Sequence, residues 1–387
     1  MQFTNKQVPF CVVRNSLLFV MLLSMSPEAK SSDEFSADTL GPRAIEGMRM
    51  VWSDEFNIDG KPDPRHWKYE SGFVRNEELQ WYQPNNAEVK NGLLVITARR
   101  DTFPNPGYDP LSSDWKKKRP YVYYTSSGIK SSGLVSYKFG TIEVRARIDT
   151  TKGSWPAIWT LGTSGEWPSG GEIDIMEFYR SAGIPSILAN VAWGTATRWV
   201  AKWDSSKKPL SYFLNKDPLW PQKFHVWRMD WTQDSIRLYL DNEMLNFTLL
   251  SQTINVRTPP VNPFLQPHYF LLNLAIGSNG GDPSKSVFPV TYEVDYIRVY
   301  QKITSANITV NSDVDWVKVE KNKIVTQLSP AILPLILSIR SSSGKLHWSG
   351  TINSSHSEIP LNQLPKGIYL INAIAESHIL REKIFVH

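Results

Sequence analysis

The sequence predicts an all-β protein with a sandwich or jelly-roll architecture. Short runs of alternating or β-branched residues recur along most of the chain, and clusters of Gly, Pro, Asn and Asp separate them. No stretch keeps a helical periodicity over three turns. Many short strands divided by frequent turns are typical of β-sandwiches and jelly rolls.

The pattern divides the chain into a large and a small β domain. In the large domain we expect strands at 93–98, 140–148, 186–193, 235–241 and 292–300. A proline-rich stretch without periodicity at 101–118 predicts a long loop, and such loops are usually functional. After Gln301 tryptophan and glycine become scarce while short strands continue. We therefore expect one domain at 49–301 and a small β-sandwich at 305–387.

The first residues differ in character from the rest. Lys6 and Arg14 precede an apolar run from Leu17 to Met25, which is typical of a secretory signal peptide and too short to span a bilayer. We expect a signal peptide at 1–30 and a linker at 31–48. Cys11, the only cysteine, lies inside this segment, so the secreted protein would have no thiol for a disulfide or a nucleophile.

Charge and aromatic content narrow the kind of partner. The formal net charge of +5 is modest for 387 residues, and its cations are scattered, which argues against a nucleic-acid-binding face. Tryptophan is abundant, and all but Trp316 and Trp348 lie between Trp52 and Trp231. Aromatic rings offer a flat apolar surface with a polar edge, which suits the C–H faces of sugars. We expect most of them to be core residues and the rest to bind carbohydrate.

The strongest chemical signal is the sequence GEIDIMEF at 171–178. In a regular strand Glu172 and Asp174 point to one face and Glu177 to the other. A β-bulge between Asp174 and Glu177 would bring all three to the same face. Three carboxyls on one face repel each other and raise the pKa of at least one, which then remains protonated to act as an acid. The alternatives are an exposed acidic strand or a cation site.

This strand resembles the active-site strand of glycoside hydrolase family 16. The resemblance extends over most of 49–301 through further motifs in the family's order. These are WSDEF at 52–56, GFVRNEELQWY at 72–82, KFGTIEVRARI at 138–148, SWPAIWTLG at 154–162 and YEVDYIRVY at 292–300. The resemblance implies a concanavalin A-like β-jelly roll with a retaining mechanism, in which nucleophile and acid/base carboxyls stand about 5 to 5.5 Å apart.

Carried over by residue, the resemblance makes Glu172 the nucleophile, Glu177 the acid/base and Asp174 the acid that supports both. It also implies a set of sugar-binding residues. These are Trp155 and Trp159 on the cleft floor, together with Asn76, Glu78 and Arg145. No cofactor is needed for catalysis. A structural Ca²⁺ is implied, with Glu55, the Gly92 carbonyl and Asp295 as ligands, since oxygen donors suit calcium.

One stretch departs from the family pattern. Laminarinase-like members commonly carry a histidine beside an aromatic residue on the strand after the catalytic one, and here the corresponding residues are Val191 to Gly194, including Trp193. Recognition on the leaving-group side is therefore expected to differ, and Trp193 is expected to be among the residues that bind the sugar. The following segment supplies Trp199 and Trp203, which we expect to wall the cleft or to pack as a surface flap.

The tail at 305–387 resembles the sorting domains of the type IX secretion system, most clearly in its last 24 residues, LPKGIYLINAIAESHILREKIFVH. The resemblance implies export by secretion machinery to the cell surface or the medium. A carbohydrate-binding module is the alternative for 305–387. We expect a monomer with no transmembrane segment after processing.

Together these observations predict a secreted endo-acting hydrolase of β-1,3-glucan (laminarin) or mixed-linkage β-1,3-1,4-glucan. A red-algal galactan such as agarose, porphyran or carrageenan is the alternative substrate on the same fold. A non-catalytic lectin is less favoured because it has no need of the three acids. A transglycosylase is less favoured because the corresponding branch of the family typically lacks the bulge residue.

Overall fold

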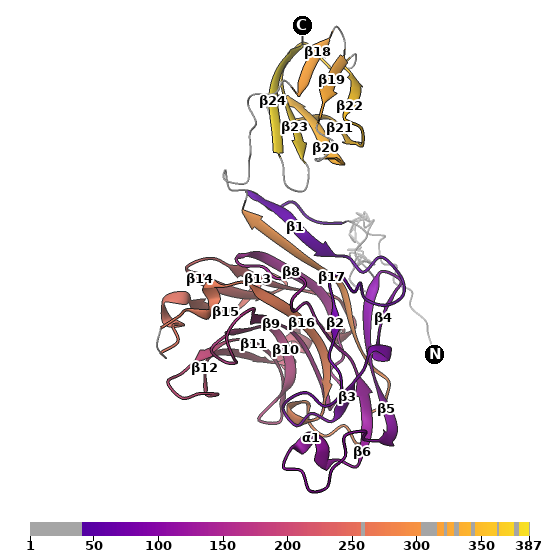
Figure 1. Ribbon diagram of the computed structural model, residues 1–387, viewed down its shortest axis with the longest axis vertical. Coiled ribbons are helices and arrows are strands. Elements are labelled where there is room, and N and C mark those ends of the chain that lie inside the picture. Colours follow the sequence, from indigo (N-terminus) through magenta and orange to yellow (C-terminus); the bar gives the residue numbers. More distant parts are fainter. Residues whose placement is uncertain are drawn as a thin grey trace, which may run out of the picture.

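A computed structural model describes residues 41–256, 260–302, 316–320, 323–328, 333–341, 345–361, 364–374 and 379–386. The expected signal peptide at 1–30 and residues 31–40 of the expected linker lie outside the described residues. Strands dominate throughout, which confirms the all-β prediction (Figure 1). Two short helices accompany them, α1 (Trp115–Lys118) and α2 (Leu210–Lys216). None of the helices in these ranges has the length and apolar character that a membrane span requires.

The large domain consists of two antiparallel-rich sheets. The first sheet contains β1 (Met48–Asp54), β3 (Gln80–Tyr82), β4 (Ala87–Lys90), β5 (Leu93–Pro104), β6 (Tyr121–Ser126), β8 (Gly140–Ile148), β13 (His225–Trp231), β14 (Ser235–Leu240), β15 (Glu243–Leu249) and β17 (Val290–Lys302). The second contains β2 (Lys68–Tyr69), β7 (Gly128–Lys130), β9 (Ser154–Gly162), β10 (Glu172–Ser181), β11 (Ile184–Gly194), β12 (Ala201–Pro209) and β16 (His268–Ile276). Short 3-10 turns lie at Pro84–Asn86, Trp220–Gln222, Leu250–Gln252, Pro263–Leu265 and Ser278–Gly280.

The second sheet places the candidate active site. Its strand order is β12-β11-β10-β9-β16-β7-β2, so β10 lies between β9 and β11 near the middle. The first sheet runs β15-β14-β13-β8-β17-β5-β6-β3, with β1 paired to β17 and β4 paired to β5. The first and last strands of the domain lie side by side, because β1 pairs with β17 and Met48 faces Lys302. The expected boundaries of 49 and 301 thus fall at paired strand ends.

Alternation of residue type explains how the two sheets pack. Along β13, His225, Trp227, Met229 and Trp231 are buried while the residues between them are partly exposed. Such alternation arises because successive side chains of a strand point to opposite faces. Burying a large apolar side chain stabilises the fold by roughly 1.5–3 kcal/mol. One continuous apolar core therefore fills the space between the sheets.

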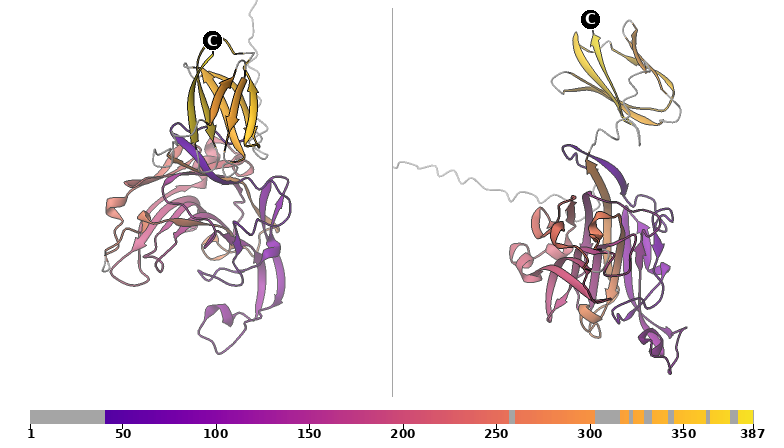
Figure 2. Two further views of the ribbon diagram at one scale, coloured as in Figure 1. Left: turned by 45° about the horizontal axis from the view of Figure 1, so that its top comes forward. Right: turned by 60° about the vertical axis from the view of Figure 1, so that its left-hand side comes forward.

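The C-terminal region forms a second β body with its own core. Its strands are β18 (Val317–Glu320), β19 (Lys323–Gln327), β20 (Leu335–Ser341), β21 (Leu346–Ile352), β22 (His356–Pro360), β23 (Gly367–Ile374) and β24 (Ile379–Val386). They form a three-stranded and a four-stranded sheet (Figure 2). Trp316 is buried in this core and Trp348 packs against it, so neither offers the exposed platform that a carbohydrate-binding module uses.

Candidate active site

Strand β10 contains the β-bulge that the acid spacing predicted. Glu172 and Asp174 pair with Ala192 and Asn190 of β11, and the register then shifts before Glu177 pairs with Leu188. The pairing with β9 shifts at the same place. Ile175 and Met176 are both fully buried, so two consecutive side chains enter the core. The extra residue restores the alternation, and the third acid returns to the face of the first two.

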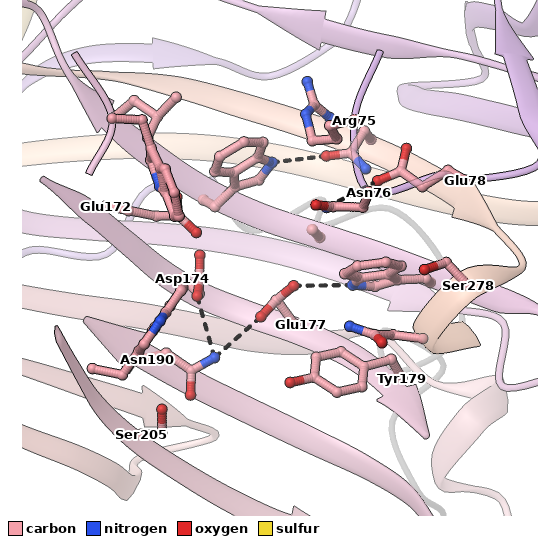
Figure 3. A pocket seen from close by; sticks show the side chains of 18 residues that line it. Arg75, Asn76, Glu78, Glu172, Asp174, Glu177, Tyr179, Asn190, Ser205 and Ser278 are labelled. Atoms are coloured by element: carbon pink, nitrogen blue, oxygen red, sulfur yellow. Dashed lines mark hydrogen bonds between the residues drawn. The ribbon is translucent and has the colours of Figure 1, made fainter. Parts of the chain in front are cut away.

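All three acids line one cleft of about 860 Å³ on the outer face of the second sheet. Figure 3 shows Glu172, Asp174 and Glu177 pointing into the same space. The other residues lining it are Arg75, Asn76, Glu78, Trp155, Ala157, Trp159, Leu161, Trp167, Tyr179, Asn190, Trp203, Ser205, Asn273, Ser278 and Asn279. Of the expected sugar-binding residues, Asn76, Glu78, Trp155, Trp159 and Trp203 are among them.

Each glutamate receives a hydrogen bond from an indole. Trp167 Nε1 donates to Glu172 Oε2 at 2.6 Å, and Trp155 Nε1 donates to Glu177 Oε1 at 2.9 Å. Asn190 Nδ2 lies 3.2 Å from Asp174 Oδ2 and 3.1 Å from Glu177 Oε2, so one amide holds two of the acids. Neutral donors orient the carboxyl groups without supplying a cation that would keep them ionised.

Burial without a paired base raises the pKa of every member of the triad. Burial raises the pKa of Glu177 to about 7, and the charge of Glu172 adds to it, although the bond from Trp155 acts in the opposite direction. Burial also raises the pKa of Asp174 well above its usual range, with repulsion from Glu177 and Glu172 adding to the effect. The pKa of Glu172 is raised by burial and lowered by hydrogen bonds from Trp167 and Asp174. Near neutrality Glu177 therefore remains partly protonated, while Glu172 has the donors that stabilise a carboxylate.

The indole of Trp159 is fixed from two sides. Its Nε1 donates to Asn273 Oδ1 at 2.7 Å, and Asn273 Nδ2 donates to the Tyr82 hydroxyl at 3.0 Å. The Arg75 guanidinium lies 5.0 Å from the centre of its ring. A rigid aromatic floor of this kind suits a sugar ring, as the sequence predicted.

Asn76 and Glu78 come from the turn before β3. Asn76 Nδ2 lies 3.3 Å from Glu78 Oε1, and Gln80 Nε2 donates to Glu78 Oε2 at 2.6 Å. Burial raises the pKa of Glu78. The structure thus brings both residues to the same end of the cleft, where Figure 3 shows them beside Arg75.

The other expected binding residues lie elsewhere. Arg145 is on β8 in the opposite sheet, where it is buried and donates to Asp295 Oδ2 at 2.6 Å. Trp193 is buried in the sandwich core. These positions correct the expectation that both contact sugar. Trp199 is 54% exposed on the loop before β12 and does not line the described cleft, so its role stays a prediction.

The side chains expected to hold calcium do not form a metal site in the structure. Both oxygens of Glu55 accept hydrogen bonds from Arg298, and Asp295 is bound to Arg145. Gly92 lies in the turn between β4 and β5. Within the ranges that the structure describes, no group of three or more His, Cys, Asp or Glu side chains could hold a metal ion. A structural calcium ion held by Glu55, the Gly92 carbonyl and Asp295 stays a prediction.

Sequence reasoning did not identify several residues of the cleft. Trp167, Asn190 and Asn273 each bond directly to a triad acid or to the aromatic floor. Asn190 had a detectable signal, because a polar residue in the middle of the buried strand 186–193 requires a partner. Trp167 lies five residues before the strand starts, and only the folded loop brings it to Glu172.

The sequence matches a known family and several characterised relatives. Residues 75–296 match glycosyl hydrolases family 16. Glucan endo-1,3-beta-glucosidase A1 of Niallia circulans is 31% identical over 296 residues, which cover 71% of this chain and 41% of that protein. A beta-glucanase of Rhodothermus marinus is 32% identical over 65% of this chain and 85% of its own length. A keratan-sulfate endo-1,4-beta-galactosidase of Sphingobacterium multivorum is 30% identical over 67% of this chain and 56% of that protein.

Solved structures show the same fold. One from work on endo-acting O-glycanases, which prominent members of the human gut microbiota express to initiate mucin breakdown, has a TM-score of 0.61 and 31% identity. It covers 69% of this chain and 95% of the other. The laminarinase catalytic domain of Thermotoga maritima has a TM-score of 0.55 and 29% identity, covering 67% of this chain and all of the other.

Proposed function

Because the chain belongs to glycosyl hydrolase family 16, we propose that it is an endo-acting, retaining hydrolase of β-1,3-glucan or mixed-linkage β-1,3-1,4-glucan. One observation carries the proposal. The bulged strand β10 directs three carboxyls, held by neutral indole and amide donors, into one cleft, and burial raises the pKa of Glu177 to about 7. The named glucanases among the relatives support the choice of substrate.

In the first step Glu172 acts as the nucleophile and Glu177 as the acid. The Glu172 carboxylate attacks the anomeric carbon, and the bond from that carbon to the leaving oxygen breaks. Glu177 gives its proton to the leaving oxygen. The hydrogen bond from the Trp167 indole orients the Glu172 carboxylate, and Asp174 lines the cleft beside it on the same strand.

In the second step Glu177 activates a water molecule, which hydrolyses the bond between the sugar and Glu172. Glu177, now ionised, takes a proton from a water molecule, and the hydroxide oxygen attacks the anomeric carbon. The bond to Glu172 breaks, and the first carboxylate is restored. Asn190 contacts both Asp174 and Glu177, so it holds the acid/base in place through both steps.

A galactose-containing chain is the second candidate substrate. The O-glycanase structure has a higher TM-score than the Thermotoga laminarinase, and a keratan-sulfate endo-1,4-beta-galactosidase is among the relatives. The sequence at Val191 to Gly194 also departs from the laminarinase pattern. The fold and the two catalytic roles would be the same for either substrate.

We further propose that the protein is exported and that strands β18 to β24 act as a sorting domain. The apolar run from Leu17 to Met25 and the resemblance of residues 364–387 to type IX sorting domains support this. The proposal is tested by comparing the full chain with a chain ending at Lys302 in cell fractions. Retention of only the shortened chain inside the cell is expected, and equal export of both would contradict it.

The substrate is tested by incubating the purified protein with laminarin, barley β-glucan, lichenan, agarose, κ-carrageenan, keratan sulfate and mucin O-glycans. Products are resolved by size over time. A ladder of intermediate oligosaccharides from the glucans is expected, because an endo-acting enzyme cuts inside the chain. Release from the galactose-containing chains alone would replace the glucan with the second candidate.

A further inference from the structure

Arg75 lies at the end of the cleft floor, over the aromatic ring that is expected to carry a sugar. Its guanidinium carbon is 5.0 Å from the ring centre of Trp159. Its side chain is 22% exposed and lines the cleft together with Glu172 (Figure 3). A guanidinium here adds hydrogen-bond donors to a subsite whose other surface is aromatic.

The hydrogen-bonding capacity of Arg75 is only partly used. Its Nη2 pairs with Glu70, which is buried beneath the cleft. Its Nη1 is buried without a partner among the described residues. An arginine has five N–H donors, and a buried donor without an acceptor is unfavourable. Glu70 thus holds the guanidinium in position, while the exposed part of the side chain, 22% of its surface, lines the cleft where it can donate to an incoming oxygen.

The backbone that presents Arg75 is strained and braced from outside. The next two residues, Asn76 and Glu77, have φ angles of 56° and 51°, a region that non-glycine residues rarely occupy. Arg119 Nη2 donates to the Glu77 carbonyl at 2.6 Å and its Nη1 donates to the Glu78 carbonyl. Strain of this kind persists where surrounding contacts fix the backbone, and it is common at ligand clamps.

Arg119 is itself fixed by the long segment before β6. Its guanidinium lies 4.9 Å from the ring centres of both Phe73 and Trp115. Asn105 Nδ2 donates to the Arg119 carbonyl at 2.8 Å, which closes the segment at its base. The segment predicted as a long loop at 101–118 in fact contains the end of β5 and helix α1, and it supports the turn that carries Arg75.

The charges of the cleft determine the chemistry of its occupant. Four carboxyl groups line it, and Arg75 is the single cation among the described residues that do so. Glu70 already offsets that charge. A sulfate or carboxylate on the substrate would face the acids with little compensation, whereas neutral hydroxyl oxygens can accept from Arg75 without that repulsion.

We propose that Arg75 is a specificity-determining residue that donates hydrogen bonds to oxygens of an uncharged sugar unit lying over Trp159. The inference rests on the proposed carbohydrate-binding function of the cleft but not on turnover or on one linkage. Glu70 orients the guanidinium from below, and Arg119 positions the turn.

The experiment measures oligosaccharide binding in a protein that cannot turn it over. In the Glu172→Gln background, affinities are measured calorimetrically for neutral β-1,3-gluco-oligosaccharides, neutral mixed-linkage gluco-oligosaccharides, and unsulfated and sulfated galacto-oligosaccharides. Arg75→Met is expected to weaken the best-bound neutral series by about tenfold or more, since hydrogen bonds to a charged donor contribute about 1.5–3 kcal/mol. Arg75→Lys is expected to recover part of the loss, because it keeps a donor without the fork.

Lys130→Met is the matched control. Lys130 Nζ lies 4.0 Å from the same Glu70 oxygen but does not line the cleft, so its loss is expected to leave affinity unchanged. Melting temperatures of all variants show whether each is folded. If Arg75→Met fails to fold, the affinity of Arg75→Lys tests the inference. That affinity is expected to be weaker than the affinity of the Glu172→Gln protein that keeps Arg75.

Three outcomes would overturn the inference. They are unchanged affinity in a folded Arg75→Met protein, tighter binding of the sulfated series than of its unsulfated counterpart, and no binding of any oligosaccharide. Binding that depends on Arg75 in a protein whose wild type cleaves nothing would keep the inference and reject the proposed hydrolase. Cleavage by the wild type, together with an affinity that Arg75→Met leaves unchanged, would keep the proposed hydrolase and reject the inference.

Discussion

Buried and partly buried carboxyls occur on both sheets of the large domain, and their partners differ. On the first sheet Asp295 pairs with Arg145, Glu293 with Arg147 and Glu143 with Arg43. On the second sheet the Glu172, Asp174 and Glu177 carboxyls have indole and amide donors instead. An adjacent cation favours the ionised form, and burial without one favours the protonated form.

The difference separates a structural use of acids from a chemical one. An arginine-paired carboxylate forms an ion pair that joins two segments of the chain, so its loss mainly affects folding. An acid oriented by neutral donors keeps the ability to give and take a proton near neutrality, as the pKa of about 7 for Glu177 illustrates. The predictions below test this distinction, beginning with the largest effect.

Removing the nucleophile is expected to have the largest effect on activity. Glu172→Gln should lower kcat by about 10⁴-fold or more, because the covalent step has no substitute group. The melting temperature should remain the same or rise, since a buried acid without a base is replaced by a neutral amide. Steady-state kinetics and calorimetry measure both, and ordinary turnover by this variant would reject the assignment of Glu172.

Removing the acid/base is expected to lower kcat by about 10²–10⁴-fold. The loss from Glu177→Gln should shrink for aryl glycosides with good leaving groups, because these need little protonation in the first step. Comparing a polysaccharide with a dinitrophenyl glycoside measures the difference. An equal loss on both would indicate that Glu177 is not the acid.

On the first sheet, breaking an ion pair should affect stability and leave chemistry unchanged. Arg145→Met leaves the buried Asp295 carboxylate without this partner, which should lower the free energy of unfolding by about 3–5 kcal/mol. Denaturant unfolding measures the loss, and kcat at a temperature where the variant is folded should match the wild type. A lowered kcat in the folded variant would mean that the two sheets are not independent in function.

The smallest effect is a shift in the pH profile. The hydrogen bond from Trp155 lowers the pKa of Glu177, so Trp155→Phe should raise it further. Activity requires protonated Glu177 and falls as pH rises through its pKa. The alkaline limb of kcat/KM, expected near pH 7 in the wild type, should therefore move upward by about one unit. A downward shift would contradict the assigned direction.

Local sequence was sufficient for the parts of the site that lie on one strand. The spacing of Glu172, Asp174 and Glu177 contains both the acids and the bulge. This spacing could not show whether a residue on another strand points to the cleft or to the core. Trp193 lies three residues after Asn190, so alternation turns it into the core when Asn190 faces the cleft.

Residues that depend on non-local packing were also beyond sequence reasoning. Arg145 belongs to a motif shared with the family, but β8 lies in the opposite sheet and its side chain meets Asp295 from β17. Arg75 reaches Trp159 only because Arg119 and the segment before it hold the turn. Such contacts join positions 40 to 150 residues apart, and no short pattern records them.

The central claim is that Glu172 and Glu177 act as nucleophile and acid/base in a double displacement, and the anomeric form of the first products tests it most directly. Proton NMR is recorded during the first minutes of cleavage of the polysaccharide that the panel shows to be the best substrate. The account predicts that the β-anomer appears first and that the α-anomer grows only by mutarotation. Initial release of the α-anomer would show an inverting reaction and contradict the roles given to the two glutamates.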